Sequence, residues 1–186
     1  MKIKLNYLIL APLMSMIMIS CSHQNNIFNK NEIYKFNNIV HAFDKILMDK
    51  YKLNDKLNYA KFSKEFISKV QKNQAPPLNA EILNLLQKIK KDKLYLDIWG
   101  VSQSECKCLF CCTDKYFLFI ENNTQNSVIS KYIDVVNNLG DVTASNSLYL
   151  MKNINKIDID KFENRLVIVV NILSTYATMY DNIGKY

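Results

Sequence analysis

Apolar residues recur three and four positions apart along most of the chain, which is the spacing of one face of an α-helix. Five stretches show this pattern, at residues 33–47, 62–70, 82–89, 128–139 and 159–183. Polar residues fill most of the positions between the apolar ones, as they do on helices that bury one face. The sequence therefore predicts a predominantly helical domain.

Residues that favour helix ends suggest boundaries for the first three helices. The first helix should begin near Asn31, and Ser63 is a candidate start for the second. Pro76 and Pro77 should stop the second helix, because proline cannot continue a helix. Asn79 can then cap a third, short helix.

The last two stretches carry similar end signals. Gly140 is suited to follow the fourth helix, and Asp160 with Glu163 resembles a capping box before the fifth. The long stripe at 159–183 could be a coiled-coil seam for a partner helix, but charged pairs beside it are sparse, which favours packing within the domain. Branched residues at 166–170 also allow a strand, although the stripe on both sides favours a helix.

Two segments alternate instead of following the helical period. Residues 94–99 and 115–120 are rich in aromatic and branched side chains, which are typical of strands. Residues 100–114 between them would form the connection. The predicted fold class is therefore α+β, a predominantly helical single domain with a two-stranded antiparallel hairpin.

Four cysteines, Cys106, Cys108, Cys111 and Cys112, lie within this connection. In an oxidising compartment they should form structural disulfides that fix the hairpin tip, with three possible connectivities. Thiolate binding of a soft metal ion by the same four residues is an alternative, although the spacing differs from paired zinc knuckles. Redox exchange and free thiols in a different compartment are further alternatives.

The net charge of +7 is unevenly distributed. Between Phe28 and Lys93 lysines outnumber acids about two to one, whereas the signs nearly balance from Asp97 onward. A solvated helix surface explains this best, and contact with anionic headgroups of a nearby membrane is the alternative. Nucleic-acid binding is not expected, because Arg165 is the only arginine.

Residues for catalysis or nucleotide binding are scarce. The chain has three glycines, at positions 100, 140 and 184, so it cannot form a glycine-rich phosphate loop. The two histidines, His23 and His41, have no evident nucleophile or carboxylate pairing. We therefore expect no enzyme activity, no catalytic residues, no nucleotide and no cofactor.

The N-terminal segment has the parts of a secretory signal: a basic start with Lys2 and Lys4, an apolar run, and a small residue at Ser20. The window Met18-Ile19-Ser20-Cys21 resembles the processing site of bacterial lipoprotein precursors. This resemblance covers residues 1–21 only. It implies cleavage before Cys21 and attachment of diacylglycerol to its sulfur, and Ser22 implies sorting to the outer membrane. An uncleaved anchor and simple secretion are the alternatives.

These features predict a signal peptide at residues 1–20, a flexible lipid-anchored tether at 21–31 and one globular domain at 32–186. The expected function is non-catalytic binding or assembly at the cell envelope, for example as an accessory of a secretion apparatus or as a virulence-associated lipoprotein. The expected partners are the membrane, through the anchor, and a protein. A metal-binding lipoprotein and an immunity or inhibitor lipoprotein are the alternatives.

Overall fold

The computed structural model of the chain describes residues 27–92, 94–99, 113–139 and 144–181. These residues form helices and connecting turns. The helices in chain order are α1 (Lys30–Tyr51), α2 (Asp55–Gln71), α3 (Asn79–Ile89), α4 (Leu94–Trp99), α5 (Asp114–Asn123), α6 (Ser127–Leu139), α7 (Ala144–Lys152), the single 3₁₀ turn η1 (Ile154–Lys156) and α8 (Phe162–Asp181).

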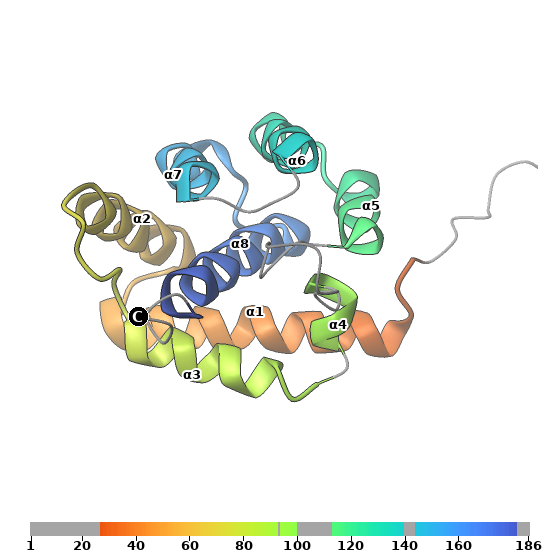
Figure 1. Cartoon of the computed structure of the whole chain (residues 1–186), viewed down its shortest axis with the longest axis horizontal. Coiled ribbons are helices and arrows are strands. Elements are labelled where there is room, and N and C mark those ends of the chain that lie inside the picture. The colour runs from red at the N-terminus through yellow and green to blue at the C-terminus, as the bar shows by residue number, and fades with distance from the viewer. Residues whose placement is uncertain (1–26, 93, 100–112, 140–143, 182–186) are drawn as a thin grey trace, which may run out of the picture.

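Helix α8 is the centre of the fold. Residues 166–177 are all buried, so this helix is covered on every side and not along one stripe only. It packs against α1, α3, α5 and α7, while α2 packs against α1 and α7, and α6 packs against α7. Figure 1 shows α8 in the middle of the molecule with the other helices arranged around it. The final apolar stripe therefore packs within the domain, as the sequence favoured.

Polar side chains on α8 hold several of its neighbours in register. The Trp99 indole of α4 donates a hydrogen bond of 2.7 Å to Ser174 Oγ, and the Thr124 hydroxyl after α5 donates one of 2.9 Å to Asn164 Oδ1. Tyr132 of α6 and Ser147 of α7 both donate to Asn171 Oδ1 at 3.1 Å. A buried polar group is costly unless it finds such a partner, so these bonds specify how the helices meet.

The predicted hairpin is wrong: both of its segments are helical, and no strand occurs among the described residues. Thr113 caps α5 by accepting a hydrogen bond from the Tyr116 amide. The helix buries Phe117, Phe119 and Ile120 and leaves Leu118 half exposed. A strand would instead place residues 118 and 120 on one face. The fold class is therefore helical within the described ranges, and not α+β.

The helices predicted from the other apolar stretches are confirmed, although some of their ends differ. Helix α2 begins eight residues before Ser63, because Asn54 caps it. Asn79 is the first residue of α3 and does not cap it; the preceding Leu78 takes a left-handed conformation without a side-chain cap. Helix α8 begins at Phe162, so Lys161 and not Asp160 precedes it. Gly140 lies outside the described residues.

Two further differences concern the chain around these helices. Helix α7 and the η1 turn were not predicted, because residues 144–156 carry no strong apolar period. The globular domain was expected from residue 32, whereas α1 begins at Lys30 and Phe28 is already buried. In the part of the chain described, no helix combines the length and the hydropathy that spanning a bilayer requires.

The helical assignment of residues 114–123 can be tested with two substitutions on the same segment. We expect Ile120→Ala to lower the free energy of unfolding by about 2 to 5 kcal/mol, because it opens a cavity in the core. Leu118→Ser should change it by less than about 0.5 kcal/mol, because Leu118 faces solvent. Urea denaturation measures both values, and similar losses at the two positions would contradict the helix.

Candidate interaction surface

The residues predicted to carry chemistry lie outside the described part of the chain. They are Cys21, Cys106, Cys108, Cys111 and Cys112. Lipidation, disulfide formation and the metal-binding alternative therefore stay predictions. His23 also lies outside, and His41 is exposed on α1. Among the described residues, no group of three or more His, Cys, Asp or Glu side chains is placed to hold a metal ion.

Two shallow grooves lie on the described surface. One of about 190 Å³ runs between α1 and α3, where Ile39, Leu85 and Ile89 form its apolar wall and Lys35 forms a 2.7 Å ion pair with Asp92. The other, of about 160 Å³, lies between α6 and α7 beside Tyr132 and Tyr149. Both are smaller than the roughly 300 Å³ that ordinarily encloses a small-molecule ligand. Neither groove provides the strongest candidate site.

Exposed apolar side chains instead gather where α1 turns into α2. Met48 is 42% exposed in the last turn of α1, Leu53 is 38% exposed in the connection, and Leu57 is 50% exposed in the first turn of α2. They account for half of the six exposed large hydrophobic residues in the described ranges. We call this region, residues 48–57, the α1–α2 corner. Clustered exposed apolar residues mark interaction sites more often than single ones do.

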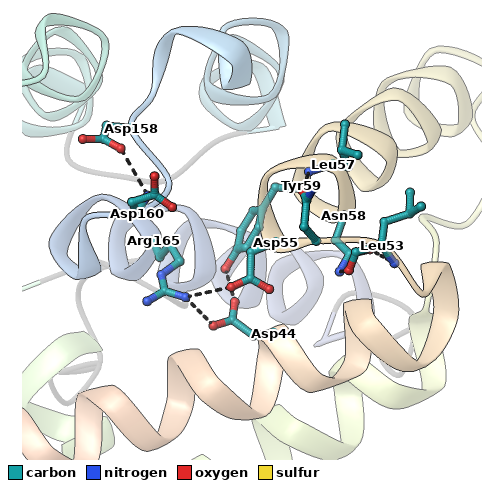
Figure 2. Close-up of polar contacts among 10 residues, drawn as sticks. Asp44, Leu53, Asp55, Leu57, Asn58, Tyr59, Asp158, Asp160 and Arg165 are labelled. Atoms are coloured by element: carbon teal, nitrogen blue, oxygen red, sulfur yellow. Dashed lines mark hydrogen bonds and ion pairs between the residues drawn. The ribbon is translucent and has the colours of Figure 1, made fainter.

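The polypeptide of the corner is held in one conformation by two asparagines. Lys52 ends α1 in a left-handed conformation, with φ of 56°. Asn54 caps α2 by accepting a hydrogen bond of 3.0 Å from the Leu57 amide. The Asn58 side chain, which is only 1% exposed, accepts from the Leu53 amide at 3.2 Å and donates to the Leu53 carbonyl at 2.8 Å. Figure 2 shows Asn58 beside Leu53, so an exposed leucine is fixed in place by a buried amide.

Lysines surround these apolar side chains. Residues 48–57 carry three lysines and two acids, and three more lysines lie within seven residues of this segment, in the stretch 45–64 between Asp44 and Glu65. All six lysines are exposed, and none forms an ion pair with another residue of the described chain. They are Lys45, Lys50, Lys52, Lys56, Lys61 and Lys64. The corner is therefore both apolar and basic.

A partly buried ionic cluster connects the corner to the core. The Arg165 guanidinium of α8 lies 2.8 Å from Asp44 Oδ2 of α1 and 3.5 Å from Asp55 Oδ2 of α2. The buried hydroxyl of Tyr59 donates a 2.8 Å hydrogen bond to the other Asp44 oxygen. Figure 2 shows these side chains converging from three helices. The cluster fixes the angle between α1 and α2, and thereby the position of the residues that connect them.

Burial dominates the electrostatics of this cluster. It raises the pKa of the Asp44 carboxyl above its ordinary value, and this effect outweighs the hydrogen bond from Tyr59 and the charge of Arg165, which both lower it. Burial, together with the nearby Asp44 carboxylate, also raises the pKa of Tyr59. Tyr59 therefore stays protonated and remains a hydrogen-bond donor. The arrangement is suited to holding helices together more than to transferring a proton.

Sequence reasoning found the basic half of the chain but not this corner. Leu57 lies on the opposite side of α2 from the stripe of Tyr59, Phe62 and Phe66. The sequence signal that could have indicated the corner was this apolar residue, Leu57, which does not belong to the buried stripe of its helix. It was missed because the start of α2 was placed at Ser63, after the corner. The ion pair between Asp44 and Arg165 joins residues 121 positions apart, which no local pattern indicates.

Comparison with known proteins gives no match to a protein family, a curated protein or a solved structure. The corner is therefore interpreted from its own geometry and charge.

A double-mutant cycle tests the ionic cluster. We expect Arg165→Met to lower the free energy of unfolding by about 1 to 3 kcal/mol, because it leaves the partly buried Asp44 carboxylate with the Tyr59 hydroxyl as its remaining partner. Asp44→Asn should cost about 1 kcal/mol, because Tyr59 can still donate to the amide oxygen. The double variant should lose less than the sum of the two single losses. Urea denaturation at neutral pH measures the coupling, and additive losses would contradict a direct interaction.

The pH dependence of stability provides a second test. Because the folded-state pKa of Asp44 is raised, protonation of Asp44 favours folding. Its contribution is fully present below the ordinary value of 3.8 and is lost as the pH rises through the raised pKa. We expect the stability of the wild type relative to Asp44→Asn to decline over that interval. Denaturation curves of both proteins at several pH values measure this difference, and a rise with pH would contradict the assignment.

Proposed function

We propose that this chain is a lipid-anchored protein of the bacterial cell envelope with a non-catalytic role in binding or assembly. The observation that carries the proposal is the lipoprotein-type processing pattern ending at Cys21, followed within a few residues by a folded domain. From Cys21 to Ile27 a fully extended chain reaches about 20 Å. A lipid on Cys21 would therefore keep the start of α1 close to the membrane surface.

The beginning of the domain is well suited to such an attachment. The ring of Phe28 packs edge-on against Phe36 and Phe119, with centroids 4.8 and 5.4 Å away. The Lys115 ammonium lies 4.3 Å from the centre of the Phe28 ring and forms a 3.1 Å ion pair with Glu32. A capping box between Asn29 and Glu32 closes the first turn of α1. An anchored chain would thus enter the fold at a fixed point.

A binding role is supported by the α1–α2 corner. The Asn58 side chain fixes the backbone of Leu53, and the ion pairs of Arg165 with Asp44 and Asp55 join α8 to α1 and α2. A surface that is rigid before binding loses little conformational entropy when it binds. This arrangement favours a protein that presents a preformed surface.

Intact mass spectrometry of the protein from its native membrane tests the anchor. We expect a chain that starts at Cys21 and carries acyl groups, since the segment before it resembles a lipoprotein signal. A Cys21→Ala variant should lose both cleavage before residue 21 and acylation. An unacylated wild-type chain would contradict the proposal.

The same spectra, recorded without reduction, report on the four clustered cysteines. Two disulfides would remove four hydrogens from the mass of the mature chain, as expected in an oxidising envelope. Free thiols with a bound metal ion would instead favour the metal-binding alternative.

A further inference from the structure

We propose that the α1–α2 corner is a second membrane contact, at which Leu53 and Leu57 enter the interface of an anionic lipid bilayer and the surrounding lysines face its headgroups. This inference rests on the proposed lipid anchor, which would hold the domain within reach of a bilayer. Together, the anchor and this second contact would define how the domain is oriented on the membrane.

The chemistry of the corner fits a lipid surface better than a protein partner. Protein interfaces are enriched in aromatic residues, methionine and arginine and depleted in lysine. Met48 fits either kind of surface, whereas Leu53 and Leu57 are aliphatic and the cations around them are lysines. Aliphatic side chains at a convex turn can insert between headgroups, while lysines extend their ammonium groups to phosphate oxygens.

Charge complementarity supports an anionic surface in particular. The stretch 45–64 carries six exposed lysines against two acids. Asp55, one of these acids, is directed to Arg165, so its charge is partly neutralised within the protein. Asp49 is the other. Phosphatidylglycerol headgroups would attract this surface, and salt would weaken the attraction because exposed charges are screened.

The position of the corner agrees with two-point attachment. The corner follows the C-terminal end of α1, whereas the tether precedes the N-terminal end, and Figure 1 shows these two ends on opposite sides of the molecule. A helix of 22 residues is about 33 Å long. Contact at both ends would place α1 along the membrane surface. The anchor raises the effective concentration of the corner at the bilayer, so a weak contact is sufficient.

Photolabelling from lipid tests this proposal on the full, acylated protein. The protein is reconstituted into vesicles of phosphatidylcholine with phosphatidylglycerol, together with a phospholipid that carries a photoactivatable group near the headgroup. Trypsin separates Leu53-Asn54-Asp55-Lys56 and the peptide from Leu57 to Lys61 from the peptide that contains Leu118. Leu118 is the matched control, because it is 50% exposed, as Leu57 is.

We expect the two corner peptides to be labelled at least about fivefold more than the Leu118 peptide, because exposed aliphatic groups near anionic lipid partition into the interface. Leu53→Ser with Leu57→Ser should reduce the labelling of the flanking peptides of α1 and α2 to the control level, whereas Leu118→Ser should not. Vesicles without phosphatidylglycerol should lower the labelling several-fold, and so should Lys56→Gln with Lys61→Gln, in which trypsin releases the corner as one peptide from Leu53 to Lys64. The matched pair Lys156→Gln with Lys161→Gln should have no effect.

Equal labelling of the corner and Leu118 peptides would overturn the proposal. So would unlabelled corner peptides in vesicles combined with cross-links from Lys56 or Lys61 to an acidic protein in native membranes, because the corner would then bind protein. The intact mass of the same sample separates the two ideas: an acylated chain with an unlabelled corner refutes the membrane contact only, whereas an unacylated chain refutes the anchor.

Discussion

A helix that is buried over about three consecutive turns needs neighbours on every side, and α8 imposes this requirement on the rest of the chain. Helices α1, α3, α5 and α7 each cover part of it, and α2 and α6 pack on those helices in turn. Polar side chains of α8 also form hydrogen bonds to its neighbours, and these specify the position of each neighbour more closely than apolar contact alone does. They belong to Asn164, Asn171 and Ser174. The number and placement of the outer helices follow from the need to enclose one apolar helix.

A segment's secondary structure could be predicted from the sequence where the local spacing of apolar residues decides it, but not where packing against other helices decides it. Where one face of a helix is apolar and the other is polar, as in α1 and α3, the spacing of the apolar residues was sufficient to predict the helix. The stretches 94–99 and 115–120 were interpreted as alternating, but each is apolar at five of its six positions, so the spacing of apolar residues separates strand from helix poorly there. Branched and aromatic residues then favoured the wrong choice, whereas the cap at Thr113 and burial against the other helices favour the helix.

The candidate surface depends even more on tertiary structure. Its lysines were evident in the sequence, but the exposure of Leu53 and Leu57 results from how α1 meets α2. That angle depends on Asp44, Asp55 and Arg165, which three different helices supply. Arginine suits this position because one guanidinium group can contact two carboxylates while keeping its charge. The same residue therefore links the central helix to the α1–α2 corner.

The central helix is also the last helix described, which has a consequence for how the chain acquires its structure. A growing chain that contains α1 to α7 but not α8 exposes the apolar faces that α8 would cover. Such a chain cannot complete a core, so cooperative folding waits until α8 has been synthesised. For a protein proposed to be exported, this delay keeps the polypeptide in the unfolded form in which it can be threaded across a membrane.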